Sequence, residues 1–219
     1  MTLGASIQSG EYMSRLMFIT TRLLNDGVHQ HVEVPTIRYL NKVGFDVTVI
    51  APKIDGRIPL EDEVEIHWVN WKRLPLMETM SRLRGIKKEL QKLLSVATFN
   101  AGIVDIMAAT TLMGVMKQHD EFPFIIDERS PPVYDHLAGR LQWIPTDRQW
   151  KKAAPSAAAC VVQSEAHVEF IQERYGLKNL NFVVFRNSVD PSRFDPGGKE
   201  SEPIAVYAGT LRKERGIRN

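Results

Sequence analysis

The stretch VGFDVTVIAP, residues 43–52, decides the fold class. It begins at the end of an expected helix near residues 34–43, where Gly44 suits a helix C-cap. Residues 46–51 are then an almost continuous apolar run, and the expected strand stops at Pro52. Such a strand is typical of a parallel sheet with both faces covered. The stretch therefore predicts a helix followed by a buried parallel strand.

Similar apolar runs recur along the chain and alternate with segments of helical spacing. This alternation predicts an α/β fold, a Rossmann-like parallel sheet flanked by helices. On the helix near residues 34–43, Ile37, Leu40 and Val43 form one apolar stripe, and Pro35 fits only in the first turn. The remaining expected strands are residues 16–21, 65–69, 103–107, 124–126, 159–163 and 181–185.

The composition and the apolar periodicity of the sequence change after residue 187. Residues 188–198 contain two prolines and two glycines without apolar periodicity, which indicates a linker, and one more apolar strand follows. A lone strand cannot offset its own ordering entropy. We therefore expect an N-terminal extension (1–14), a Rossmann-like domain (15–187), a linker (188–202) and the start of a truncated second domain (203–219).

Composition excludes several function classes. The 28 Lys and Arg nearly balance the 26 Asp and Glu, and a net charge of +2 argues against nucleic acid as a partner. Cys160 is the single cysteine and no Cys/His cluster has zinc-site spacing, so we expect a cytoplasmic protein without a metal. No apolar run approaches the roughly 20 residues that span a bilayer, and residues 1–14 lack the pattern of a signal peptide.

The loop at residues 25–29 follows the first expected strand, where open α/β sheets bind ligands and a helix N-terminus favours anions. No G-x-G-x-x-G pattern is present, which argues against a dinucleotide site. A phosphate or sugar site, and a tight turn that needs Gly27, both remain open. His29 and His31 are candidates to act on a substrate or simply surface histidines.

Charged residues follow the strand at residues 124–126. Asp127, Glu128 and Arg129 stand directly at its carboxyl end, where unpartnered charge is costly. Asp127 and Arg129 share a strand face, so either they pair with each other or they line a cleft. After the last strand, Arg215 could bind a diphosphate or belong to a solvated charged loop.

Residues 68–93 interleave tryptophan, leucine and methionine with lysine and arginine. Tryptophan beside a basic helix is a feature of interfacial membrane binding. The simpler interpretation, which we favour, is a packed helix with a solvated basic face. Cys160 lies inside an expected strand and is expected to be a small core residue.

Four stretches resemble the family 4 glycosyltransferases, which adopt the two-domain GT-B fold. Residues 43–52 resemble the family's GHEVTVITP-like strand, and residues 159–165 its A-D-x-V-I-x-x-S-E strand. Residues 184–196 resemble V-I-P-N-G-V-D-x-x-x-F-x-P, the most specific of the four. Residues 205–217 resemble Y-x-G-R-L-x-x-x-K-G-I, which opens the donor-binding second domain of the family.

The sequence also departs from the family pattern. Ser188 replaces a usual glycine, and Thr210 stands where an arginine would hold the donor diphosphate, whereas Arg215 keeps the charge of a usual lysine. Asp127 to Ser130 resemble the D-x-R-D variant of the family, with Arg129 where many members have a histidine. The paired-glutamate motif of the second domain is missing from the sequence.

The resemblance implies retaining transfer of a sugar from a nucleotide-diphosphate sugar to a saccharide or lipid-linked acceptor, without cofactor or metal. Polysaccharide or glycolipid biosynthesis and peripheral contact with the inner membrane face are further expectations. We expect this chain to be the acceptor-side domain of such an enzyme. A second chain is one possible source of the donor-binding domain. The implied roles are catalytic for Asp127 and Arg129, donor-phosphate binding for Gly27 and Arg215, and acceptor binding for Asp26 and His29.

Two alternatives from other classes stay open at this point. The first is a non-catalytic remnant, or a partner subunit of a two-chain glycosyltransferase. The second is an unrelated α/β nucleotide-binding enzyme such as an epimerase or dehydrogenase, against which the missing glycine fingerprint counts.

Overall fold

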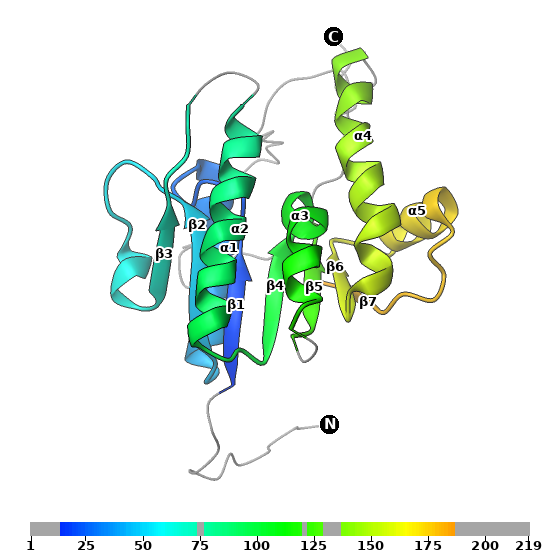
Figure 1. Cartoon of the computed structure of the whole chain (residues 1–219). Helices are drawn as coiled ribbons and strands as arrows, with labels where there is room; N and C mark the ends of the chain where they lie inside the picture. The colour runs from blue at the N-terminus through cyan, green and yellow to red at the C-terminus, as the bar shows by residue number, and fades with distance from the viewer. Residues whose placement is uncertain (1–13, 74–76, 120–121, 129–136, 187–219) are drawn as a thin grey trace, which may run out of the picture.

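A computed structural model describes residues 14–73, 77–119, 122–128 and 137–186, with only the backbone described for residues 28, 29 and 137–142 (Figure 1). Within this part, seven parallel strands form one sheet in the order β3-β2-β1-β4-β5-β6-β7. The strands are β1 (Arg15–Ile19), β2 (Asp46–Pro52), β3 (Glu65–Val69), β4 (Ala101–Asp105), β5 (Phe124–Asp127), β6 (Ala159–Val162) and β7 (Phe182–Val184). The helices are α1 (Gly27–Lys42), α2 (Glu78–Val96), α3 (Ile106–Met116), α4 (Leu137–Lys152) and α5 (Glu165–Tyr175), with short 3-10 turns η1 (Pro59–Asp62) and η2 (Ala154–Ser156).

The predicted Rossmann-like fold is confirmed, and all seven expected strands are present. The expected strand at residues 103–107 is misplaced, because β4 ends at Asp105 and α3 begins at Ile106. Asp105 caps α3 by accepting a hydrogen bond from the backbone N–H of Met107 at 3.1 Å. An aspartate at a helix N-cap accounts for this early end of the strand.

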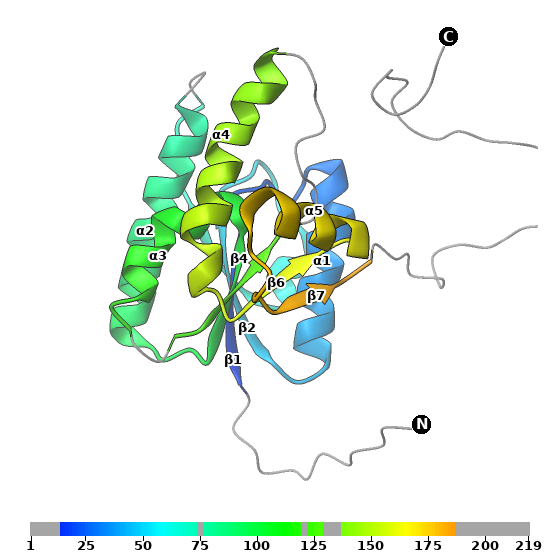
Figure 2. The ribbon, with the colours of Figure 1, turned by 90° about the vertical axis from the view of Figure 1, so that its right-hand side faces the viewer.

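Helices cover both faces of the sheet. Figure 2 shows α2 and α3 on one side of the strands and α1 on the other. Alternate residues of β1 reach the two cores, since Met17 and Ile19 belong to one buried cluster and Phe18 to the other. The larger core also contains Trp150 of α4, which is 1% exposed. Cys160 is fully buried in the same core, as expected.

Helix α1 begins seven residues before its expected start. It runs from Gly27, so Pro35 lies inside the helix rather than in its first turn. Proline donates no hydrogen bond there, and one carbonyl of the preceding turn loses its helical partner. Packing overrides this penalty, because Val34 and Ile37 on the same helix are buried in the smaller core.

The end of α1 agrees with the expected glycine cap. Gly44 has a φ of +100° and its N–H donates to the carbonyl of Asn41, while the N–H of Phe45 donates to Leu40, both at 3.1 Å. This pair of bonds is a Schellman motif, which needs a left-handed residue. Val43 is the helix cap and is 42% exposed, so it does not continue the expected apolar stripe.

Helix α2 is a packed helix, as the simpler interpretation predicted. Ile86, Leu90 and Leu93 are buried against the sheet, and a side chain at Gly85 would collide with Val69 of β3. Its apolar side is therefore not available to enter a bilayer. None of the described helices is both long and apolar enough to span a membrane. The expected linker and second domain, and nearly all of the N-terminal extension, lie outside the described residues.

Candidate functional site

The strand order reverses between β1 and β4, which is the topological switch point of the sheet. In open α/β sheets, ligands bind beside the carboxyl ends of the strands at this point. Here the same edge gathers buried polar side chains that come from three neighbouring strands and from α1. They are Thr20, Thr21, Glu33, Asp105, Asp127 and Glu128.

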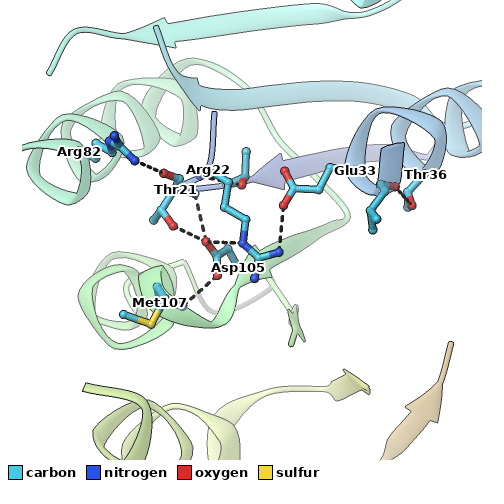
Figure 3. A network of polar contacts seen from close by, with 9 residues as sticks. Thr21, Arg22, Glu33, Thr36, Arg82, Asp105 and Met107 are labelled. Carbon is cyan, nitrogen blue, oxygen red and sulfur yellow. Dashed lines mark hydrogen bonds and ion pairs between the residues drawn. The ribbon is translucent and has the colours of Figure 1, made fainter. Parts of the chain in front are cut away.

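Asp105 joins β4 to the segment that follows β1 (Figure 3). Its Oδ2 accepts hydrogen bonds from both the backbone N–H and the hydroxyl of Thr21, the former at 3.3 Å, while Oδ1 caps α3. The side chain is 4% exposed. One buried carboxylate therefore fixes the segment after β1 and the start of α3 together at the switch point.

Arg22 supplies the positive charge of this cluster. Its Nη1 lies 3.4 Å from Oε1 of Glu33, and its Nε lies 3.8 Å from Oδ2 of Asp105 (Figure 3). Burial lowers the pKa of Arg22, but the charges of Asp105 and Glu33 outweigh burial and raise it above its ordinary value. The guanidinium is therefore a permanent cation between two carboxyl groups of the site.

Glu128 lies below the surface, next to Asp127 at the end of β5. Its Oε2 accepts a hydrogen bond from the indole N–H of Trp150 at 3.1 Å, and its backbone N–H donates to Val161 of β6. Its exposed fraction is 2%, against 8% for Asp127. Asp127 is thus the carboxylate of this strand end that lies nearer to the surface.

Two carboxyl groups of the cluster have strongly raised pKa values. Burial raises the pKa of Glu33 to about 7, and the charge of Arg22 only partly opposes this rise. Burial and the nearby charge of Asp105 raise the pKa of Glu128 to about 7. At neutral pH each is divided between an acid that donates a hydrogen bond and a carboxylate that accepts one. Perturbed carboxyl groups in a strand-end cluster are a feature of functional sites.

The first turn of α1 borders the same edge. Asp26 is its exposed N-cap residue, and its side chain makes no capping hydrogen bond. Gly27 has an ordinary backbone conformation, and a Cβ added there would meet no atom within 4 Å. The fold does not require glycine at this position, so the tight-turn interpretation of Gly27 finds no support.

The structure brings only some of the predicted site residues together. Asp127 belongs to the buried cluster, and Asp26 and Gly27 lie at the start of α1. For His29 only the backbone in the first turn of α1 is described, and His31 is exposed. Arg129 and Arg215 lie outside the described residues, and so does the expected pairing of Asp127 with Arg129.

Sequence reasoning missed Arg22, Glu33 and Asp105 as members of the site. Asp105 had a readable signal, because an aspartate directly before an apolar helix is a typical N-cap. Arg22 and Glu33 are 11 residues apart, and no sequence pattern indicated that they would pair. No three described His, Cys, Asp or Glu side chains have an arrangement that could hold a metal ion.

A hollow of about 340 Å³ lies at the opposite, amino edge of the sheet. Lys117, His119 and Phe122 line part of it. None of the buried carboxyl groups reaches it. The switch point therefore remains the better candidate for the site.

Comparison with known proteins identifies solved structures of similar fold and one matching family. No curated protein matches the chain at a significant level. A sucrose-phosphate synthase from Thermosynechococcus elongatus superposes with a TM-score of 0.59 at 11% identity, over 83% of this chain and 50% of that one. UGT2 of Phytolacca americana, in complex with UDP-2fluoro-glucose and pterostilbene, gives 0.57 at 13% identity, over 83% and 54%.

The chain thus spans about half the length of the sucrose-phosphate synthase and UGT structures that it matches. The likeness to these structures extends over the Rossmann-like half described above. The profile of Glycosyltransferase Family 4 matches residues 27–193, which include α1, the end of β4 and the carboxylates of β5. The chain therefore belongs to glycosyltransferase family 4.

Proposed function

We propose that the protein transfers a sugar from a nucleotide-diphosphate sugar to an acceptor, and that this chain forms the acceptor-side half of the cleft. The observation that carries the proposal is the buried carboxyl and guanidinium cluster at the switch point, next to the open space at Gly27. In the proposed reaction, the bond from the anomeric carbon to the diphosphate breaks and a bond to an acceptor oxygen forms with retention.

The donor diphosphate is proposed to lie against the first turn of α1. The free N–H groups of a helix N-terminus and the helix dipole favour an anion. The absence of a Cβ at Gly27 lets the diphosphate approach the backbone closely, and no atom from elsewhere in the described residues lies within 4 Å of the Cβ position. Arg215 is the proposed second contact to the phosphates. UGT2 of Phytolacca americana and a transferase from Siraitia grosvenorii were solved with UDP-containing ligands, which agrees with such a donor.

The acceptor is proposed to lie over the end of β5. Asp127 accepts a hydrogen bond from the acceptor hydroxyl and orients its oxygen toward the anomeric carbon. Arg129 follows in the chain and is the proposed cation beside it, while Asp26 and His29 bind the acceptor from the other side of the cleft. The proposed acceptor is a saccharide or a lipid-linked molecule, in polysaccharide or glycolipid biosynthesis in the cytoplasm.

The proposal is tested by nucleoside diphosphate release from a panel of nucleotide sugars, starting with UDP-glucose. The intact polypeptide that carries this sequence is compared with Asp127→Asn. We expect a loss on the order of 100-fold or more in kcat/KM, which is typical when a positioned catalytic carboxylate is removed. Asp46→Asn is the matched control, because Asp46 pairs with Arg15 at the amino edge of the sheet. Equal rates for wild type and Asp127→Asn would reject the role of Asp127.

A further inference from the structure

We propose that Arg22 is a further contact for the donor diphosphate, and that Glu33 releases Arg22 for this role by taking up a proton when the donor binds. Arg22 belongs to the segment that leads from β1 into α1, before Gly27. Glu33 lies on α1, after Gly27. The inference rests on the proposed function, because it assumes a donor diphosphate at the first turn of α1.

The guanidinium of Arg22 is held at long distances for a buried ion pair. Its Nη1 lies 3.4 Å from Oε1 of Glu33, and its Nε lies 3.8 Å from Oδ2 of Asp105 (Figure 3). Both distances exceed the roughly 2.7 to 2.9 Å of a strong charge-assisted hydrogen bond. Oδ2 of Asp105 also accepts two hydrogen bonds from Thr21, so Asp105 keeps partners when the guanidinium turns away.

Arg22 lies close enough to the proposed diphosphate position to change partners. The side chain of Arg22 is 20% exposed, against 4% for Glu33 and for Asp105, so Arg22 is the member of this group that reaches solvent. Helical side chains tilt toward the N-terminus, so the carboxyl of Glu33 and the guanidinium beside it lie toward the first turn of α1. A guanidinium on a flexible stem can turn from there to a diphosphate, which it binds in a bidentate manner.

Glu33 loses its cation when Arg22 turns to the diphosphate. The residue is 3% exposed, and a buried carboxylate without a partner is costly. Burial raises the pKa of Glu33 to about 7, and the charge of Arg22 opposes this rise more strongly than the hydrogen bond with Thr20 does. Loss of the Arg22 charge and arrival of the negative diphosphate therefore both favour the protonated acid.

Two other charged groups that act on Glu33 come from the neighbouring strands. Asp105 ends β4 and Asp127 ends β5, and each of these negative charges raises the pKa of Glu33 further. On α1 itself, only the backbone is described for His29, one turn before Glu33, and His31 is exposed. Neither aspartate can replace the positive charge of Arg22, so a proton from solvent is the proposed replacement.

The test is isothermal titration calorimetry of the intact polypeptide with UDP-glucose, in buffers of different ionisation enthalpy, which counts the protons taken up on binding. UDP-glucose is the probe because its diphosphate carries no group that titrates near neutral pH. Loss of a neighbouring cation raises the proton affinity of a carboxylate at least about 10-fold. We therefore expect uptake of about half a proton at about pH 7.5, and an affinity for UDP-glucose that falls about 10-fold from about pH 6 to about pH 9.

Two variants identify the residues that carry the coupling. Glu33→Gln imitates the protonated acid, so it should bind UDP-glucose with most of the proton uptake lost. Arg22→Gln/Glu33→Gln removes the phosphate contact without leaving Glu33 as an unpaired charge. The double variant should bind at least about 10-fold more weakly than Glu33→Gln, which is the loss of a hydrogen bond to a charged group.

Glu128→Gln is the matched control for proton uptake. It removes another buried carboxyl group with a pKa of about 7, but the hydrogen bond from Trp150 lowers that pKa more than the charge of Arg22 does. Glu128→Gln should therefore keep most of the uptake. A loss of uptake as large as in Glu33→Gln would overturn the assignment to Glu33.

The coupling and the proposed function can fail separately. Binding of UDP-glucose with a heat that does not depend on the buffer would overturn the coupling and leave the proposed function intact. Unchanged uptake in Glu33→Gln, or equal affinity of Arg22→Gln/Glu33→Gln and Glu33→Gln, would also overturn it. Failure of UDP-glucose and of every other nucleotide sugar in the panel to bind would overturn the proposed function, and the coupling with it.

Discussion

Replacing Gly27 by alanine separates the needs of the fold from those of the site. The added methyl group meets no atom within 4 Å, and the backbone there is not in the left-handed region. Alanine also favours the helical state more than glycine does, because the unfolded chain loses less freedom on folding. Gly27→Ala should therefore raise the free energy of unfolding by about 0.4 to 1 kcal/mol.

The effect on activity should have the opposite sign. If the donor diphosphate lies against the Gly27 backbone, the methyl group occupies its space and displaces it. A misplacement of about 1 Å costs on the order of 100-fold in rate. We therefore expect kcat/KM for the nucleotide sugar to fall about 100-fold in a protein that is slightly more stable than the wild type.

The assay combines thermal unfolding with nucleoside diphosphate release by the intact polypeptide. A gain of up to about 1 kcal/mol corresponds to a rise of about 2 to 4 °C in Tm for a chain of this size. Gly114→Ala in α3 is the matched control, because that exposed helical glycine also has open space at its Cβ. It should gain stability without losing activity. Unchanged kcat/KM in Gly27→Ala would refute the placement of the donor.

Two further predictions concern the buried cluster. Asp105→Ala should lower the free energy of unfolding by about 3 to 5 kcal/mol in urea unfolding, because it leaves buried donors and Arg22 without their carboxylate. Asp46→Ala, which breaks an exposed pair, should cost no more than about 1 kcal/mol, and similar losses for both would contradict the role of Asp105. Glu33 and Glu128 keep protons up to about pH 7 in the fold but only to about 4.5 when unfolded, so stability should fall as pH rises from about 5 to about 8. Each rise in pKa corresponds to about 3 kcal/mol, and Glu33→Gln/Glu128→Gln should flatten the fall in Tm across this range; an unchanged slope would reject the raised pKa values.

The fold could be predicted from the sequence because its central strands are largely buried on both faces. Residues 46–51 and the other apolar runs differ from helical segments in both length and periodicity, so all seven strands could be found. The predicted start of α1 was wrong because a proline such as Pro35 usually marks the first turn of a helix. Burial of the neighbouring Val34 and Ile37 stabilises the helix despite the proline, and a local sequence pattern does not show which residues will be buried.

The candidate site was less predictable than the fold. Asp127 stood out because charge at the end of a buried strand needs a partner, but the charge of Asp127 acts on Arg22, which lies more than 100 residues away in the chain. Such a long-range interaction depends on the strand order, which single-sequence patterns do not give. The proposed role of Gly27 could also not be inferred from the sequence alone. Only the open space at its Cβ position shows that packing does not require a glycine there, which leaves contact with a ligand as the proposed reason for it.

Hydrogen exchange of the intact polypeptide, with and without UDP-glucose as the probe, tests most directly that the switch point is the functional site. We predict slower exchange with UDP-glucose in residues 20–30, which include Thr21 after β1 and the first turn of α1. The amino edge around residues 117–119, beside the 340 Å³ hollow, should exchange as before. Protection confined to that amino edge, with residues 20–30 unchanged, would contradict the placement of the site.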